Sequence, residues 1–247
     1  VLACTGSDYR GVHLGKILLK TTENSQYSQD NLYQQATHQA EVNVPAGSHK
    51  LYLQSHDTVQ KIIIACTKGS ELLLLETASS PLQQTTFIQL NLEDGANVTH
   101  VRLAKDNDIA LSRIEVTQAK NSTYKLIQLS TLSSLQRTEI LTELKGEQAH
   151  SEIQYLSLAQ GKAHHDMQAE VRHLAPNCTS EVAVRQLAAD TAKCIFAGKC
   201  YVDIISQQTD ANMQIKNLLL SPKAEAYSKP ELEIYADDVK CAHGNAT

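Results

Sequence analysis

Near the end of the chain, a cysteine and a histidine alternate within residues 240–244 (KCAHG). If a strand predicted from Leu232 to Val239 continues through them, Cys241 and His243 point to the same face, roughly 6.6 Å apart along the chain. A thiolate and an imidazole at this spacing can bind one metal ion, and the irons of iron–sulfur clusters accept both kinds of ligand. A buried cysteine beside a hydrogen-bonded histidine is the alternative interpretation of the same pair.

A second group of possible metal ligands lies at His164, His165 and Asp166, with His150 and His173 nearby in sequence. Imidazole and carboxylate groups suit zinc or iron. Adjacent residues of a strand face opposite sides, however, so His164 and His165 would not converge on one ion. We therefore interpret these histidines as residues of the surface or of a side-chain ladder.

Motifs of familiar catalytic centres are missing from the sequence, which has no G-x-S-x-G and no H-E-x-x-H. Residues 198–200 (GKC) are the nearest approach to a phosphate-binding loop. That loop needs glycine at position 193, which is Lys193, and a serine or threonine where Cys200 stands. The six cysteines include no C-x-x-C pair, which argues against a zinc knuckle or a disulfide framework. We identify no catalytic residues.

The elements that position the Cys-x-His pair alternate apolar and polar residues with a period of two. Ile88, Leu90 and Leu92, for example, are separated by polar residues, as is typical of half-buried strands. Short polar breaks separate these strands, and none is long enough to be a linker: residues 93–95, 145–147 and 175–177. The pattern predicts a single all-β domain over residues 1–247, with about residues 1–40 as an N-terminal lead-in.

The predicted strands recur in a long repeat. Similar short segments begin at positions 90, 114, 142, 169, 201 and 232, at spacings of 24, 28, 27, 32 and 31 residues. A period of this size is typical of a β-solenoid, in which each coil buries its inner face by stacking on the next. A β-sandwich is the alternative, but it should show more turn and aromatic residues than the 10 Gly, 5 Pro, 9 Tyr and 2 Phe found here.

Composition limits the classes of partner. The sequence has 22 Lys+Arg and 27 Asp+Glu, a formal net charge of −5, so it lacks the basic character of a nucleic-acid-binding domain. Its longest apolar run, residues 62–66, is far shorter than the roughly 20 residues of a membrane-spanning helix. We expect a cytoplasmic protein with reduced thiols that binds neither nucleic acid nor membrane.

The segment that holds the Cys-x-His pair, residues 229–244 (KPELEIYADDVKCAHG), resembles the signature of the SufB/SufD family, the scaffold subunits of the SUF iron–sulfur cluster assembly system. Further matches lie at residues 173–177, 196–199, 208–210 and 217–221. The similarity is dense from about residue 160 to the end, and before that it rests mainly on the repeat. SufB departs from the ELEIYADDVKCAHG stretch, so the SufD branch is the more similar one.

The resemblance implies a right-handed parallel β-helix, a heterodimer with SufB through the last coils, and an ATPase, SufC, bound to a C-terminal helical domain. The chain stops at Thr247, so we expect that helical domain to be missing and this chain to be the β-helix core. Without SufB, a homodimer is expected through the coils that include residues 200–243. Asn245 departs from the family pattern, in which Ala-Thr follows the motif glycine directly, and it can shift the register after Gly244.

The resemblance also implies a non-catalytic scaffold on which a transient iron–sulfur cluster assembles at the SufB interface. His243 is the residue expected to reach the nascent cluster, with Cys241 as a secondary contact. The hydrogen-bond partner that fixes the imidazole tautomer is expected to be a backbone carbonyl or a carboxylate such as Asp237 or Asp238. Two alternatives are a carbohydrate-active solenoid enzyme, which would need a row of carboxylates with basic or aromatic groups on one face, and a purely structural binding module.

Overall fold

The computed structural model describes residues 18–21, 38–55, 59–78, 83–104, 109–131 and 134–247, and within these ranges it contains strands and turns but no helix. No membrane-spanning helix is therefore found in this part of the chain. Most of the predicted lead-in, about residues 1–40, lies outside the described residues. The strands are β1 (Leu18–Thr21), β2 (His38–Val44), β3 (Gly47–Ser55), β4 (Val59–Cys66), β5 (Ser70–Ala78), β6 (Gln83–Leu92), β7 (Asn97–Ala104), β8 (Ile109–Gln118), β9 (Thr123–Thr131), β10 (Leu135–Leu144), β11 (His150–Ala159), β12 (His164–His173), β13 (Thr179–Ala188), β14 (Lys193–Val202), β15 (Thr209–Leu219), β16 (Glu225–Ile234) and β17 (Val239–Ala246).

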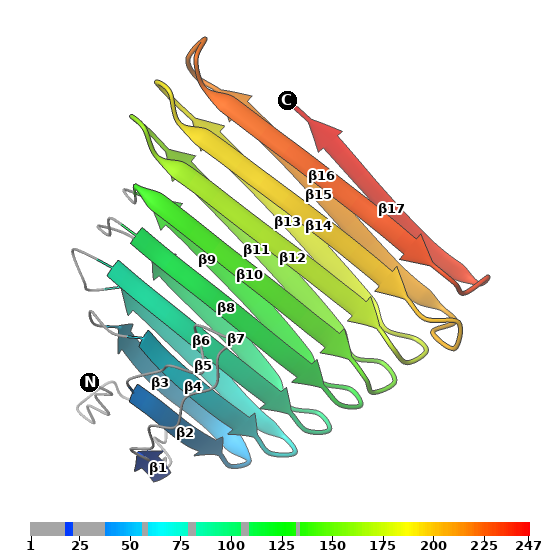
Figure 1. Cartoon of the computed structure of the whole chain (residues 1–247). Coiled ribbons are helices and arrows are strands. Elements are labelled where there is room, and N and C mark those ends of the chain that lie inside the picture. The colour runs from blue at the N-terminus through cyan, green and yellow to red at the C-terminus, as the bar shows by residue number, and fades with distance from the viewer. Residues whose placement is uncertain (1–17, 22–37, 56–58, 79–82, 105–108, 132–133) are drawn as a thin grey trace, which may run out of the picture.

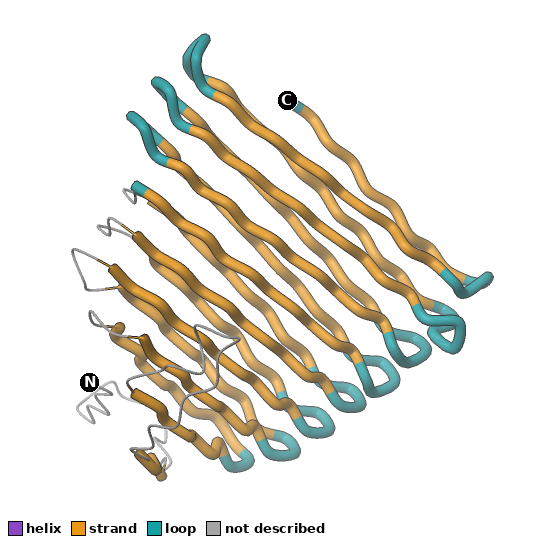
Figure 2. The backbone as a smooth tube through the Cα atoms, in the orientation of Figure 1, coloured by secondary structure: helices purple, strands orange, loops and turns teal. Residues whose placement is uncertain are grey.

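Alternate strands belong to two sheets that lie face to face (Figure 1). Strands β2 to β16 with even numbers form the even sheet, and strands β3 to β17 with odd numbers form the odd sheet. Each coil of the chain adds one strand to each sheet, and all neighbours are parallel except β1, which pairs antiparallel with β2. The predicted parallel β-helix is confirmed, in a flattened form with two sheets (Figure 2).

Residues of the even sheet stack in register from coil to coil. Ile88 pairs with Ile114, which pairs with Ile140, and the row continues through Ala169 and Gly198. All six repeated segments of the sequence begin on even strands. The repeat therefore marks one complete coil, but it conceals that each period contains two strands.

The continuous strand expected from Leu232 to Val239 is not formed. Strand β16 ends at Ile234, the chain turns at residues 235–238, and β17 begins at Val239. The alternation of apolar and polar residues continues across this turn because Ala236 is buried at the corner. The sequence pattern therefore predicted one strand where the structure has two. Pairing of β17 with β15 runs in register through Asn245, so this residue causes no shift there.

From the β4–β5 corner to the β14–β15 corner, each turn from the even to the odd sheet has one residue in the left-handed backbone conformation. At Gly95 the angle φ is 67°, a region where glycine avoids the steric cost of a Cβ. The amide of Gly95 donates a hydrogen bond to the carbonyl of Lys120 in the next coil, at 2.8 Å. Equivalent corner residues have φ between 56° and 62°: Asn121, Gln148, Asn177 and Gln208. The polar breaks of the sequence are these stacked corners.

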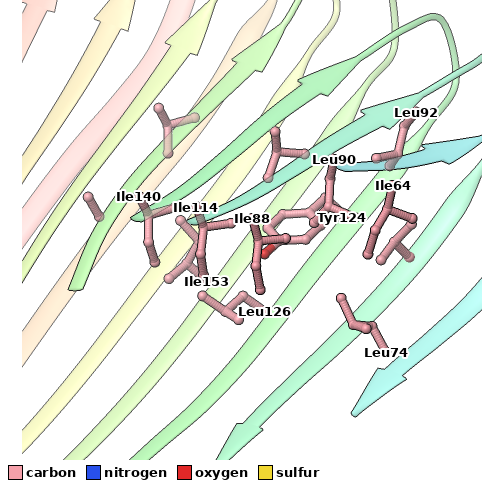
Figure 3. Packing of buried hydrophobic residues seen from close by; sticks show 14 of the residues in the cluster. Ile64, Leu74, Ile88, Leu90, Leu92, Ile114, Tyr124, Leu126, Ile140 and Ile153 are labelled. Atoms are coloured by element: carbon pink, nitrogen blue, oxygen red, sulfur yellow. The ribbon is translucent and has the colours of Figure 1, made fainter. Parts of the chain in front are cut away.

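The core fills the space between the two sheets and is mostly aliphatic. Leu74, Ile88, Ile114 and Leu126 are fully buried and pack against one another from both sheets (Figure 3). Burial alternates residue by residue along strands such as β8 and β12, as the period of two in the sequence predicts. The large core aromatic residues lie inside as well: Tyr124, Tyr155 and Phe196.

A charged network is buried among these apolar side chains. Arg102 donates hydrogen bonds to Glu76 from Nε at 2.5 Å and from Nη2 at 2.8 Å. His100 Nε2 lies 3.0 Å from Oε2 of the same carboxylate. The guanidinium also donates to Gln128 at 3.0 Å and to Ser112 at 2.8 Å. The network thus crosses three neighbouring coils inside the solenoid.

Electrostatics fix the charges of this network. Burial alone would raise the pKa of Glu76, but the charge of Arg102 and the hydrogen bonds from His100 and Arg102 lower it to about 2. Burial lowers the pKa of His100, so its imidazole is neutral at pH 7. The interior therefore holds one carboxylate against one guanidinium, and loss of one partner leaves an uncompensated buried charge that is strongly destabilising.

Replacing Glu76 with glutamine tests this balance, because Glu76→Gln keeps the side-chain shape and leaves the charge of Arg102 uncompensated. We expect the free energy of unfolding to fall by about 3–5 kcal/mol at pH 7, measured by urea denaturation. As the folded pKa lies below the ordinary value of 4.5, the carboxylate stabilises the protein above that pH and loses its effect between about 4.5 and 2. The difference in the free energy of unfolding between wild type and Glu76→Gln should therefore shrink as the pH falls from about 4.5 to 2.

Glu147→Gln is the matched control. Its carboxylate meets Lys120 at 3.1 Å on the surface, where the two side chains are 42% and 52% exposed. Surface pairs contribute about 0–1 kcal/mol, so this variant should unfold nearly as wild type does. A Glu76→Gln variant no less stable than Glu147→Gln would contradict the assigned role of the buried network.

Candidate functional site at the last coil

Cys241 and His243 both lie on β17 and point into the solenoid. Cys241 pairs in register with Ala211, and His243 pairs with Met213, and both partners are buried. The row that ends at His243 contains fully buried Leu126 farther back along the odd sheet. The two residues therefore occupy core positions on one face of the strand, as their spacing predicts.

These core positions are only partly covered. Within the described residues β16 and β17 each pair with a single neighbour, and they are the outermost strands at one end of the two sheets (Figure 1). Cys241 is half-buried and His243 is exposed, whereas Met213 directly beneath is 2% exposed. We call the inward residues of β16 and β17 the open end. It presents a thiol and an imidazole on an apolar floor.

Cys241 packs against a small cluster that contains Cys200 and Ala211. Burial raises the pKa of Cys200 to about 12, and the neighbouring Cys241 adds to this effect. Burial also raises the pKa of Cys241, with a further contribution from Asp210. Both thiols are therefore protonated at neutral pH, and a metal ion that binds either of them must displace its proton.

The carboxylate expected to orient His243 is engaged elsewhere. Asp238 accepts a hydrogen bond from the amide of the Gln208 side chain, and its own backbone amide donates to Gln207 Oε1 at 2.9 Å. Asp237 and Asp238 lie in the turn before β17, while His243 stands well inside the strand. In the described coils no hydrogen bond orients the His243 imidazole, so either ring nitrogen can be the one that offers its lone pair to a ligand.

Gly198 shapes the floor of the open end. A Cβ at this position would lie 2.5 Å from Sδ of Met213 and 2.7 Å from Cε1 of Phe196, so only glycine leaves room for them. The thioether of Met213 thus reaches across the interior from the odd sheet to the even sheet. Sequence reasoning missed this contact, because residues 198 and 213 lie on strands of opposite sheets. No local sequence pattern shows which residues of the two sheets face each other.

The second group of histidines is divided between two faces of β12. His164 lies on the outer face and His165 on the inner face, which confirms that they do not converge. The inward histidines and His150 contact hydroxyl groups: His165 Nδ1 to Ser157 Oγ at 2.7 Å, His173 Nε2 to Ser180 Oγ at 2.8 Å and His150 Nδ1 to Thr179 Oγ1 at 2.7 Å. Among the described residues, no three His, Cys, Asp or Glu side chains are grouped to hold a metal ion. A metal at the open end would therefore need further ligands.

A groove of about 380 Å³ lies on the outer face of the even sheet. Its three glutamates each form an ion pair: Glu139 with Arg137 at 3.0 Å, Glu170 with Arg172 at 2.7 Å and Glu231 with Lys229 at 2.5 Å. A glycosidase needs two carboxyl groups that flank the substrate and exchange protons with it. Carboxylates that are ion-paired with basic neighbours are not arranged for this proton exchange with a substrate. The groove therefore does not favour the carbohydrate-active alternative.

The fold and the open end together define a parallel β-solenoid whose last coil carries a thiol and an imidazole. Residues 50–247 match the family described as SUF system FeS cluster assembly, SufBD core domain. The match covers most of the chain, and the chain belongs to this family.

Three relatives are similar to the chain over most of its length. An iron–sulfur cluster assembly SufBD family protein of Synechocystis is 30% identical over 66% of this chain, and the iron–sulfur cluster assembly protein SufD of Escherichia coli is 29% identical over 63%. The chloroplastic protein ABCI7 of Arabidopsis thaliana is 28% identical over 75%. The aligned parts are 38%, 37% and 41% of these relatives, so the chain matches well under half of their length.

Gly198→Ala tests the floor of the open end. The added methyl group must displace Met213 and Phe196, and overpacking of this kind costs about 1–3 kcal/mol, so the free energy of unfolding should fall by that amount. Urea denaturation gives the measurement. Gly244→Ala is the control, because nothing lies within 4 Å of a Cβ built there. Equal stability of the two variants would show that the floor is not tightly packed.

Proposed function

We propose that residues 1–247 are the β-helix core of a SufD-type scaffold subunit, cytoplasmic and not itself an enzyme, which pairs with SufB in iron–sulfur cluster assembly. One observation carries the proposal: in a chain of the SufBD family, Cys241 and His243 stand at core positions that the last coil leaves uncovered. In this role the nascent cluster is the cargo of the scaffold. It is assembled and passed on.

The ligand types suit a transient cluster. Iron–sulfur irons take thiolate ligands, and an imidazole in place of a thiolate alters the properties of the cluster and favours its release. His243 is exposed and can offer a nitrogen lone pair to iron without losing a proton. Cys241 is half-buried and must be deprotonated first, which makes it the secondary contact. The remaining ligands come from the partner subunit.

The open end also suits a partner of similar architecture. Strands β16 and β17 expose unpaired backbone on their outer edges in the described structure, and an edge of this kind readily pairs with another strand. Leu232 and Val239 are only half-buried beside it. A second solenoid that stacks on this end covers both the backbone and the apolar side chains, and a two-fold arrangement closes the assembly. SufB is the proposed partner, and a second copy of this chain replaces it in its absence.

ATP hydrolysis is assigned to SufC and not to this chain. Residues 198–200 lie inside β14, where Gly198 faces the interior and Cys200 is 4% exposed. A phosphate-binding loop needs backbone amides that are free to cradle phosphate. Residues buried within a central strand do not provide them, which supports the role of a scaffold.

His243→Ala should sharply lower cluster formation and keep the fold and the contact with SufB. The imidazole is exposed, so its loss should change the melting temperature little, while maturation of a reporter iron–sulfur enzyme should fall about tenfold or more. The measurement is the activity of that enzyme in cells whose own SufD-type subunit is deleted and replaced by this protein. Cys241→Ala should have a smaller or equal effect.

His164→Ala is the matched control, a histidine on the outer face of β12 far from the last coil. It should support maturation as wild type does. Normal maturation with His243→Ala would remove this histidine from the mechanism. Lost maturation together with a melting temperature several degrees lower would make His243 a structural residue instead.

Pairing through the open end predicts that the chain alone forms dimers at micromolar concentration. Ile234→Glu places a charge on the uncovered face of β16, where the native side chain is 38% exposed, and two such charges would meet in a two-fold dimer. We expect light scattering to give a dimer for wild type and a monomer for the variant. The control is Leu135→Glu, which changes a side chain of the same exposure, 38%, on the outer face of β10. A monomeric wild type would refute the proposed interface.

A further inference from the structure

The inward face of the odd sheet changes its chemistry between β15 and β17. Three successive inward side chains of β15 are apolar and at most 4% exposed, and the three that pair with them on β17 carry a thiol, an imidazole and a carboxamide. The pairs are Ala211 with Cys241, Met213 with His243 and Ile215 with Asn245. The inward face of β17 therefore suits a polar ligand better than it suits another layer of apolar core.

Solubility of the open end does not explain this change. A terminal coil that only has to be soluble would replace apolar inward residues on both of its strands. Strand β16 keeps Leu232 and Ile234 at inward positions, where they pair with buried residues of β14, and Ile234 is 38% exposed. The polar side chains are instead gathered on β17, the strand that carries the proposed cluster ligands.

Asn245 is the inward residue that follows His243 on β17. Same-face neighbours of a strand stand roughly 6.6 Å apart along the chain. Asn245 pairs with Ile215, whose apolar side chain offers it no hydrogen bond, and in the described part of the chain its carboxamide has no other hydrogen-bond partner. The hydroxyl of Thr247, farther along, already accepts a hydrogen bond from Asn217 at 3.1 Å. Asn245 therefore places a free carboxamide beside the His243 imidazole.

A carboxamide next to an iron–sulfur cluster acts through its N–H groups. Its nitrogen carries two donors, whereas its oxygen is a hard ligand that suits Mg²⁺ or Ca²⁺ better than an iron bound to sulfide. The sulfides of a cluster accept hydrogen bonds, and these bonds contribute to the reduction potential. Because reduction adds negative charge to the cluster, a donor stabilises the reduced form more and raises the potential.

We propose that Asn245 donates a hydrogen bond from Nδ2 to a sulfide of the nascent cluster that His243 binds. This inference rests on the proposed function and adds a second kind of contact to the same site. His243 supplies a ligand to iron, and Asn245 contacts the sulfide. Since Asn245 is not a ligand of iron, it sets the reduction potential of the cluster and not the amount of cluster that forms.

The test uses the complex of this protein with SufB, reconstituted with iron and sulfide under anaerobic conditions. Asn245→Ala should keep the iron and sulfide content of wild type and lower the reduction potential, measured by stepwise reduction followed by electron paramagnetic resonance. Asn245→Asp should lower the potential further, because a carboxylate of the same shape has no N–H donor and adds negative charge. Asn245 is exposed, so the melting temperature should change little in both variants.

Asn212→Ala is the matched control. Asn212 lies on β15, the strand that pairs with β17, but on the outer face of the odd sheet, where its register partner is Ala242. Its side chain does not face the open end. The variant should therefore keep both the cluster content and the reduction potential of wild type.

Two results would overturn the role of Asn245. One is an unchanged reduction potential in both Asn245 variants, in a complex whose cluster content depends on His243. The other is loss of the cluster in Asn245→Ala at an unchanged melting temperature, which would make the carboxamide a support of the ligands and not a contact of the sulfide. His243→Ala tests the proposed function separately. A cluster content that this variant does not lower, or a wild-type complex that takes up no cluster, would refute the proposed function and the role of Asn245 with it.

Discussion

Stacking of one coil on the next is the interaction on which every other feature of this protein depends. A single coil cannot bury its inner face, so each inward side chain is covered only when coils lie on both sides of it. In the middle of the solenoid Ile114 and Leu126 are completely buried in this way. At the last coil the equivalent position is His243, and it is exposed. Among the described coils, the same row is therefore covered in the middle of the solenoid and uncovered at β17.

The same rule decides where polar side chains are tolerated. A polar group in a middle coil is cut off from water and must find its partners inside, as Glu76 and Arg102 do with Gln128. These three residues belong to one inward row of the odd sheet, and that row ends at Asn245. Asn245 is exposed and needs no such network. A polar residue that is costly in a middle coil is therefore tolerated at β17 without such partners.

The sequence predicted the parallel β-helix and the shared face of Cys241 and His243, because a period of two and a repeat of one coil are both visible in a linear pattern. It did not predict that each period contains two strands, since alternation continues through a tight corner such as the one at Ala236. The buried ion pair had a signal that we did not use. Glu76 falls in phase with buried Leu74, and a charge in an apolar phase indicates a buried network.

Contacts between facing rows could not be predicted, because they depend on how the two sheets are placed across the interior. Met213 reaches Gly198, and Cys241 packs against the cluster that contains Cys200. No pattern in the sequence between these residues relates one row to the other. Period and phase give the side of the sheet to which a residue points. They do not give the residue of the opposite sheet that it meets.

If the proposed function holds, uncovered core positions link subunit assembly to cluster chemistry. In the proposed pairing, a second subunit that stacks on the open end turns His243 and Cys241 into buried residues, which removes water from around any metal they hold. Attraction between a cation and its ligands is stronger in such surroundings than in water. By linkage, a cluster that binds the paired state more tightly stabilises the pair by the same free energy. Cluster formation and subunit pairing would then be thermodynamically linked, so that each favours the other. Both would depend on the uncovered inward positions of β16 and β17.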